Sequence, residues 1–229
     1  MNIRRERFQM ALVLLVLPFL AKAQSYEKEG WDLKKEGEGI FVYTKSVPGF
    51  EYKAIKVYAN FNTSMSSIIA VLKDVPAYTS WVYICKESNN LKKISETEEY
   101  YCTETAPPWP LRNRDVVVKS TFSQDPVTKI VTSRFVAVED ESYPEVDGLV
   151  RVKEMEGEYV LMPQDDGSID IHYQLKANPA GLLPVWLVNM TIANGPFQSF
   201  LKLKEKVSEE KYQRARYDFL EEPKFGRNQ

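Results

Sequence analysis

Alternating apolar and polar positions run through most of the chain and predict β-strands. Residues 39–47 and 52–61 are rich in β-branched and aromatic side chains, and Pro48-Gly49-Phe50 forms a natural turn between them, so we expect a hairpin. Comparable segments, separated by turn signals, follow at about 86–94, 98–105, 115–123, 129–138, 149–162 and 169–177. The pattern predicts an antiparallel sheet of about seven to nine strands.

The segment at 169–177 separates its two faces clearly. Its apolar face carries Ile169, Ile171, Tyr173 and Leu175, which alternate with polar residues. His172, the only histidine, falls on the opposite face. We therefore expect it on the solvent side rather than in a cleft, where it could act as a general base.

Two segments have the spacing of amphipathic helices. The first begins behind Thr63 or Ser64 as a cap and ends at Pro76. The second runs from Pro184 to about Arg216, with a wide apolar stripe and an expected bend at Gly195-Pro196. Its stripe is wide enough to cover the apolar face of the sheet. The pattern therefore predicts an α+β fold in which a curved antiparallel sheet grips a long C-terminal helix.

The N-terminus has the composition of a secretory signal. Arg4, Arg5 and Arg7 precede the apolar run 10–21, and Ala21-Lys22-Ala23 offers a cleavage site. The run is shorter than the roughly 20 residues that span a bilayer, so a retained anchor is the weaker interpretation. We expect residues 1–23 to be cleaved, 24–217 to form one domain and 218–229 to be a polar tail. The mature protein would be a periplasmic or secreted monomer.

Charge and motifs exclude several functional classes. The net charge of the chain is −2, loss of the basic signal segment makes it more acidic, and no long basic run favours nucleic acid. Neither a G-x-S-x-G elbow, H-E-x-x-H, C-x-x-C nor a glycine-rich phosphate loop occurs. The acidic runs 95–99 and 139–145 are interpreted as solvated turns rather than metal sites. The sequence therefore predicts no catalytic residue, no metal site and no cofactor.

Cys85 and Cys102 are the only cysteines and flank a predicted hairpin. In an exported protein they could form a disulfide. Two buried free thiols are the alternative, because the expected register leaves the two residues several positions apart.

Four features in order carry a resemblance to a known family. They are DVPAYTSW (Asp74 to Trp81), PPWPLRNRD (107–115), YQLKANPAGLLPVWLVN (Tyr173 to Asn189) and the long C-terminal helix. From about Trp31 to Tyr212 the chain resembles the START domain, the lipid-transfer domain related to steroidogenic acute regulatory protein. It is similar in particular to the exported single-domain bacterial members.

The resemblance implies a helix-grip fold with an internal apolar cavity that binds one lipid or sterol-like molecule. Many members carry such a ligand between membranes, which implies transient membrane contact. Residues 107–115 correspond to a loop at the cavity mouth, in which Pro108 and Pro110 stiffen the backbone around Trp109 as a gate. A core aromatic is the alternative for Trp109. Arg114 and Asp115 would hold the root of the loop as a structural hydrogen-bonding site rather than contact the ligand.

The residues expected to line the cavity are Trp109, Phe135, Tyr173, Ile192, Phe197 and Phe200. Two other functions stay open at this point. The same fold hosts cyclase, aromatase and hydrolase-like enzymes that act on hydrophobic substrates. An interaction protein whose cavity is filled by its own side chains is the third interpretation.

Overall fold

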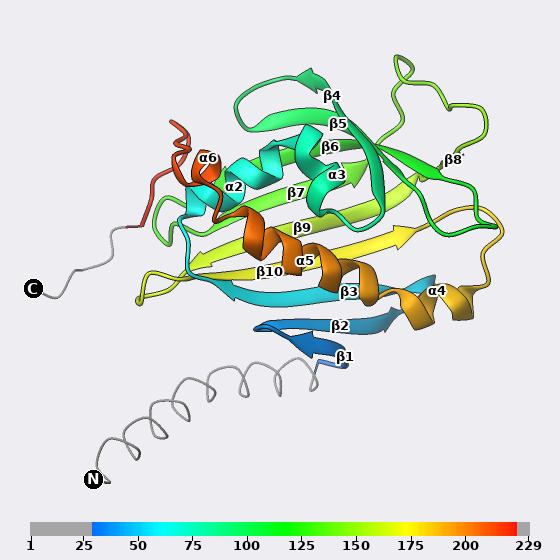
Figure 1. Ribbon diagram of the computed structural model, residues 1–229, viewed down its shortest axis with the longest axis horizontal. Helices are drawn as coiled ribbons and strands as arrows, with labels where there is room; N and C mark the ends of the chain where they lie inside the picture. The colour runs from blue at the N-terminus through cyan, green and yellow to red at the C-terminus, as the bar shows by residue number, and fades with distance from the viewer. Residues whose placement is uncertain (1–28, 224–229) are drawn as a thin grey trace, which may run out of the picture.

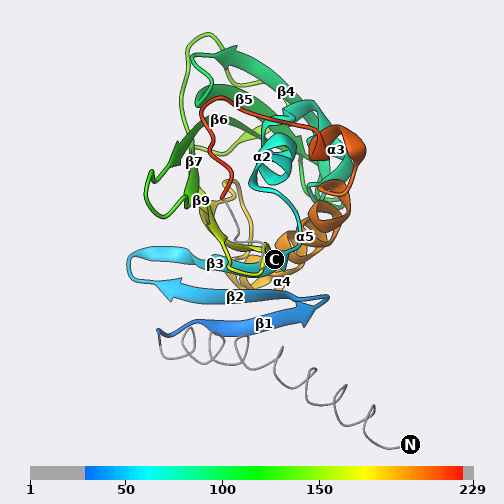
Figure 2. The same ribbon diagram turned by 90° about the vertical axis from the view of Figure 1, so that its left-hand side faces the viewer.

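A curved antiparallel sheet holds the helices on its concave side, as the sequence predicts. The computed structural model describes residues 29–223. Its sheet follows the order β1-β2-β3-β10-β9-β7-β6-β5-β4, and the short β8 pairs in parallel with β6. Figure 1 shows helix α5 lying across the sheet, and Figure 2 shows the strands curving around helices α2, α3 and α5. The strands are β1 (Asp32–Gly37), β2 (Ile40–Val47), β3 (Phe50–Phe61), β4 (Cys85–Lys93), β5 (Glu98–Thr105), β6 (Arg114–Gln124), β7 (Val131–Ala137), β8 (Val150–Arg151), β9 (Glu154–Pro163) and β10 (Ile169–Asn178).

The predicted strands are found within a few residues of their expected bounds, with two differences. Strand β1 was not predicted, because its sequence DLKKEG is mostly charged and lacks an apolar alternation. The segment 149–162 was predicted as one strand but is two. Residues Val150–Arg151 pair with β6, whereas Glu154–Pro163 pair with β7 and β10. The chain changes neighbours there, which periodicity alone does not reveal.

The first predicted helix is α2 (Met65–Lys73), and Ser64 is its cap. The Ser64 hydroxyl accepts a hydrogen bond from the Ser67 amide at 3.1 Å, which satisfies one of the free amides of the first turn. The helix ends before Pro76, which lies in the 3₁₀ turn η1 (Val75–Ala77). The short helix α3 (Tyr78–Trp81) follows and leads into β4.

The prediction of a single long C-terminal helix from the apolar stripe is wrong. The segment forms three helices, α4 (Val185–Thr191), α5 (Asn194–Lys206) and α6 (Glu210–Gln213). The first break falls just before the expected bend, because Pro196 fits the first turn of α5, where its missing amide costs no hydrogen bond. Helix α4 has no buried residue, whereas Phe197, Phe200 and Leu203 of α5 are buried.

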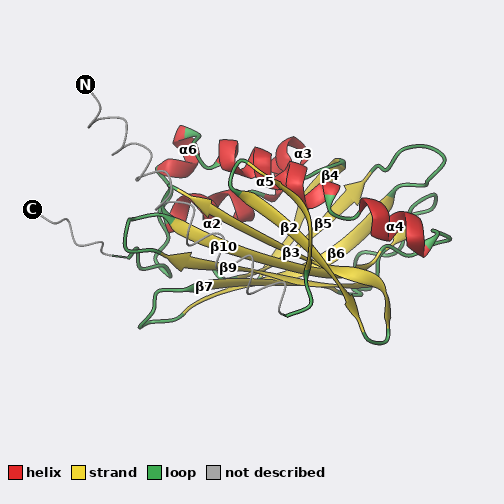
Figure 3. Cartoon of the chain, turned by 90° about the horizontal axis from the view of Figure 1, so that it is seen from below, coloured by secondary structure: helices red, strands yellow, loops and turns green. Residues whose placement is uncertain are grey.

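Two apolar clusters occupy the two faces of the sheet. The main core lies between the sheet and the helices, which Figure 3 shows together on one side of the strands. A smaller cluster of Trp31, Tyr43 and Tyr58 lies on the outer face, with Leu33, Phe41 and Ala54 packed against it. His172 also lies on this outer face, where its ring packs edge-on against Tyr58 at 5.3 Å.

The predicted boundary between the domain and a polar tail, at residue 217, lies too early in the chain. Tyr217, Phe219 and Leu220 pack against the main core. The Glu222 carboxylate accepts hydrogen bonds from the amides of Met65 and Ser66, at 3.2 and 2.7 Å, at the start of α2. These contacts tie the chain to the domain at least as far as Glu222, because a carboxylate satisfies the free amides of a helix N-terminus and interacts well with its dipole.

The predicted signal peptide, residues 1–23, lies outside the described residues. Within residues 29–223, no helix combines the length and the apolar character needed to cross a bilayer.

Candidate functional site

Four aromatic rings from three strands and one helix meet between the sheet and α5. Tyr159 of β9 and Tyr173 of β10 have ring centroids 4.7 Å apart, and Tyr173 lies 5.7 Å from Phe200 of α5. Phe135 of β7 stacks on Tyr173 at 6.0 Å. We call Phe135, Tyr159, Tyr173 and Phe200 the aromatic cluster. The cluster joins the inner face of the sheet to the helix that the sheet grips.

Strand alternation and one glycine place these rings. Phe135 is the register partner of Gly157, and a Cβ atom on Gly157 would lie 2.3 Å from the Phe135 ring. The absence of a side chain at position 157 therefore makes the space that Phe135 occupies. Tyr159 and Tyr173 are register partners on neighbouring strands, which brings their rings together on one face.

The inner face is sealed at one end and accessible at the other. Toward α2, the side chains of Leu161, Ile169 and Ile171 are completely buried. Toward α4, the inner side chains that pack on the core are only partly buried: Ala137, Val152, Met155, Tyr159, Tyr173 and Leu175. The accessible part of the inner face is therefore apolar and lies next to the aromatic cluster.

The tyrosines of this region are deep in the protein although part of their surface is accessible. Burial raises the pKa of Tyr159 and Tyr173, and nearby phenols raise it further. Burial likewise raises the pKa of Tyr78 and Tyr101, which pack edge-on at 5.6 Å beside the same core. All four phenols are neutral at neutral pH, so the region presents aromatic surface and hydroxyl groups without charge.

The structure brings together only some of the residues predicted to line a cavity. Phe135, Tyr173 and Phe200 lie in the aromatic cluster. Ile192 is partly buried between α4 and α5. Phe197 is buried against the first strand, where the Lys35 ammonium lies 4.7 Å from its ring centroid.

Sequence reasoning missed Tyr159, Met155 and Leu175 as site residues. Side chains alternate between the two faces of a strand, so Tyr159 and Met155 share the inner face of β9 with Leu161, and Leu175 shares the inner face of β10 with Tyr173. Their alternation was visible in the sequence. Their proximity to one another was not, because it depends on strand pairing.

The loop after β5 carries Trp109 on the surface. Its side chain is 92% exposed, so Trp109 neither lines the interior nor serves as a core aromatic in this structure. The flanking Pro108 and Pro110 are also exposed, and the Trp109-Pro110 bond is cis. At the root of the loop, the Asn113 side chain donates to the Glu104 carboxylate at 2.5 Å.

Arg114 and Asp115 do not act as a pair. Adjacent strand residues point to opposite faces, and Asp115 binds Arg151, with Nη2 to Oδ2 at 2.8 Å and Nε to both oxygens at 3.1 Å. The hydrogen bond to Asp115 raises the pKa of Arg151. Arg114 instead donates to the carbonyl oxygen of Arg112 and is buried. The hydrogen bonds of these two side chains therefore lie at two separate sites.

The disulfide that the sequence allows is not formed. Cys85 pairs with Thr105, whereas Cys102 pairs with Asn89, three residues further along the ladder. That separation is roughly 10 Å along the strands, beyond the reach of a disulfide. Both thiols are free, and burial raises the pKa of each.

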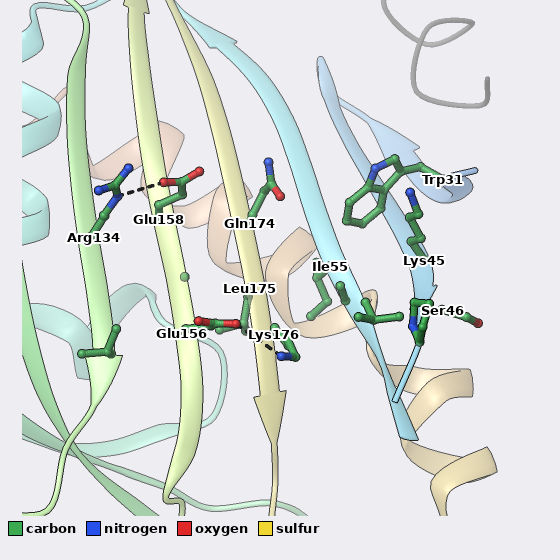
Figure 4. Close-up of a pocket in the computed structure, with 15 residues that line it drawn as sticks. Trp31, Lys45, Ser46, Ile55, Arg134, Glu156, Glu158, Gln174, Leu175 and Lys176 are labelled. Carbon is green, nitrogen blue, oxygen red and sulfur yellow. Dashed lines mark hydrogen bonds and ion pairs between the residues drawn. The ribbon is translucent and has the colours of Figure 1, made fainter. Parts of the chain in front are cut away.

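A groove of about 550 Å³ lies on the outer face of the sheet, opposite the helices. Figure 4 shows Arg134, Glu158 and Gln174 projecting from neighbouring strands, with Trp31 and Lys45 at the other side of the groove. Two of its charged pairs are matched within the groove: Arg134 pairs with Glu158 at 3.4 Å, and Lys176 pairs with Glu156 at 3.4 Å. The Lys45 ammonium, which also lines the groove, donates to the backbone oxygen of Glu29 at 2.6 Å. We favour the inner face as the site because it is apolar and carries the aromatic cluster.

Comparisons with known proteins agree with this architecture. The family model described as "START domain" matches residues 18–211. An uncharacterized protein of Pseudomonas aeruginosa is 30% identical over 176 residues, which cover 77% of this chain and 86% of that protein. Phosphatidylcholine transfer protein of Rattus norvegicus is 28% identical over 203 residues, which cover 86% and 89% of the two chains.

A solved structure is similar in both sequence and fold. The STAR-related lipid transfer protein of Xanthomonas axonopodis, as a fragment, superimposes with a TM-score of 0.73 at 31% identity, covering 79% of this chain and 99% of that one. The family match covers most of the chain, and the curved sheet with its C-terminal helices is the architecture of these relatives. This chain therefore belongs to the START domain family, whose members bind and transfer lipids.

Proposed function

We propose that this protein binds a lipid or another hydrophobic small molecule in a cavity between the inner face of the sheet and α5, and carries it between membranes. The observation that carries the proposal is the state of Tyr159 and Tyr173. Both are surrounded by protein atoms closely enough for burial to raise their pKa, yet both keep accessible surface. Side chains that are deep and still accessible are expected along the wall of a ligand cavity, which supports the proposal.

The chemistry of this space suits an apolar ligand. Moving apolar surface from water into it contributes roughly 25 cal/mol per Å², before the cost of ordering the ligand. The phenol groups supply hydrogen bonds at fixed positions without a charge that would have to be desolvated. The relatives named for lipid transfer and for phosphatidylcholine support the same ligand class.

The exposed apolar side chains at the accessible end support a transient contact with a membrane. Leu182 before α4 and Trp186 and Met190 on α4 are 104%, 68% and 66% exposed, and Trp109 is 92% exposed. Aromatic and aliphatic side chains of this kind insert into the interface of a bilayer. We propose that release requires the loop around Trp109 and the C-terminal helices to move apart. We propose a periplasmic or secreted location, which rests on the N-terminal sequence alone.

An enzyme is less well supported. The titratable groups of the aromatic cluster are phenols whose pKa is raised by burial. A general acid or base works best with a pKa near the working pH, and these groups are moved away from it. The cluster is thus better suited to hold a hydrophobic molecule than to transfer protons to it.

A pair of variants on one strand tests the location of the site. Leu175→Trp would fill the inner space beside the aromatic cluster, whereas Gln174→Trp adds the same ring on the opposite face, in the outer groove. Native mass spectrometry after incubation with total membrane lipids should show one bound lipid per chain for wild type and Gln174→Trp, and little for Leu175→Trp. Leu175 also borders the outer groove, so loss of binding in Gln174→Trp, alone or together with Leu175→Trp, would move the site to the outer groove. Absence of any lipid on wild type would refute the proposed function.

A further inference from the structure

Arg114 is a buried cation without a counter-charge among residues 29–223. It is 8% exposed and begins β6 with the inward parity of Val116, Val118 and Phe122, which lie in the main core. Its guanidinium donates to the carbonyl oxygen of Arg112. A guanidinium has five donor hydrogens, so this contact satisfies only a small part of its capacity.

The neighbouring carboxylates are already engaged elsewhere. Asp115 points to the other face and binds Arg151. Glu104 pairs with Lys86 at 2.9 Å and accepts a hydrogen bond from Asn113 at 2.5 Å. Within residues 29–223, no acidic side chain forms an ion pair with Arg114.

This arrangement is costly unless a partner is supplied. Burial lowers the pKa of Arg114, and the nearby positive charge of Arg112 lowers it further. The guanidinium nevertheless stays charged at neutral pH, because arginine does not deprotonate in proteins. A buried charge requires a partner and several hydrogen bonds. Arg114 therefore has donors that an anion from outside the chain can occupy.

Arg114 also stands at the accessible end of the inner face. The loop between β10 and α4 approaches it: a Cβ atom on Gly181 would lie 3.9 Å from the Arg114 Nη2 atom and 3.6 Å from Val150. Along β6, Arg114 lies six residues from Ser120, the register partner of Phe135, which is roughly 20 Å. The side chains of Ala137, Val152 and Met155, at the same end of the inner face, are partly buried and pack on the main core.

We propose that Arg114 binds the oxyanion, a carboxylate or a phosphate, of an amphiphilic lipid whose apolar part extends along the inner face to the aromatic cluster. The inference rests on the proposed function and narrows its ligand class: neutral sterols and triglycerides, which have no oxyanion, are disfavoured. The planar guanidinium fork matches both oxyanions with two parallel hydrogen bonds.

Matched ligand pairs test this without any mutation. Isothermal titration of wild type compares oleate with methyl oleate, and lysophosphatidic acid with monooleoylglycerol, so that each pair keeps its tail and differs in the anion. In at least one pair, we expect the anion to bind with a dissociation constant at least about tenfold lower than that of its neutral analogue, because charge-assisted hydrogen bonds contribute about that much affinity. The pair that shows the preference identifies carboxylate or phosphate. Inorganic phosphate, which has no tail, should bind at least a hundredfold more weakly than lysophosphatidic acid.

Variants then assign the preference to Arg114. Arg114→Gln should remove the preference for the anion and leave binding of the neutral analogues unchanged, whereas Arg134→Gln, on the outer face, should change neither. The ligand-free Arg114→Gln protein should melt at the same or a higher temperature, because a buried uncompensated charge is removed. A merely structural role would lower its melting temperature and leave the preference intact.

The outcomes separate this inference from the proposed function. Equal binding of anionic and neutral analogues by wild type would overturn the role of Arg114 while leaving lipid binding in place. Equal binding of inorganic phosphate and lysophosphatidic acid would overturn the role of the tail. Failure of all four lipids to bind wild type would overturn both proposals.

Discussion

Gly157 gives the sharpest test of how the sheet makes room for the aromatic cluster. In Gly157→Ala, the new Cβ atom would lie 2.3 and 2.7 Å from two carbons of the Phe135 ring and 2.5 Å from the backbone oxygen of Gln174. These separations are well inside van der Waals contact. The ring must rotate toward Tyr173, or strands β9 and β10 must part, and overpacking of this kind costs about 1–3 kcal/mol.

Chemical denaturation monitored by circular dichroism measures this loss as a change in the free energy of unfolding. Gly195→Ala is the comparison, because its added methyl group meets only the ring of Tyr83, at 3.2 Å, and that side chain is 38% exposed and free to move. We expect Gly195→Ala to change stability by less than about 1 kcal/mol, since it also removes a helix-weakening glycine.

A double-mutant cycle separates the two clashes at Gly157. In a Phe135→Ala background, which by itself costs about 3–5 kcal/mol, the ring is absent and only the conflict with the Gln174 oxygen remains. Gly157→Ala should therefore cost at least about 0.5 kcal/mol less there than in wild type. A Gly157→Ala protein as stable as wild type, or a cycle with no coupling, would refute the argument that this glycine creates the space for Phe135.

Four further predictions follow from other parts of the fold. Asp115→Asn should lower the free energy of unfolding by about 3–5 kcal/mol, because it leaves the Arg151 guanidinium without its carboxylate, and stability equal to wild type would contradict this. Glu222→Gln should cost about 1 kcal/mol by weakening the contacts with the start of α2, and loss of residues after 217 should cost at least as much in thermal denaturation. Trp109→Ala should leave the unfolding free energy within about 0.5 kcal/mol of wild type, since the side chain is exposed, but should change the rate of fluorescent-lipid exchange; an unchanged rate would remove its gate role. Burial raises the pKa of Tyr173 in the folded state, so above about pH 10 the folded protein retains a proton that the unfolded chain loses. The free energy of unfolding should therefore fall as the pH rises beyond that value, and it should fall less steeply in Tyr173→Phe. An identical pH dependence of the two proteins would argue against a buried phenol.

Local signals in the sequence were sufficient for most elements. The hairpin of β2 and β3 was predictable because alternation and a Pro-Gly turn are both local properties. Helix α2 was predictable because its cap at Ser64 and its end before Pro76 lie within the segment itself. The parity of β10 also placed Tyr173 on the inner face and His172 on the outer one correctly. In each case the deciding interactions are between residues close in sequence.

Where the outcome depended on distant partners, the sequence was less informative. An apolar stripe of constant period predicted one C-terminal helix, but the chain is divided into α4, α5 and α6. The charged segment 32–37 becomes a strand because β2 offers it a pairing edge. The segment 218–229 was predicted to be a polar tail, yet Phe219 and Leu220 pack on the core and Glu222 contacts a helix more than 150 residues away in the chain.

The sequence by itself determined the class of fold, the family resemblance and the apolar character of the inner face, because these depend on residue type and period. Tertiary structure alone decided which side chains meet. It joined Phe135, Tyr159, Tyr173 and Phe200 from four elements and paired Asp115 with Arg151. In the part of the chain that the structure describes, it also buried Arg114 without a carboxylate partner. The physical reason is that ion pairs and ring contacts act over a few ångströms. Strand register and helix docking, which are long-range in sequence, set those distances.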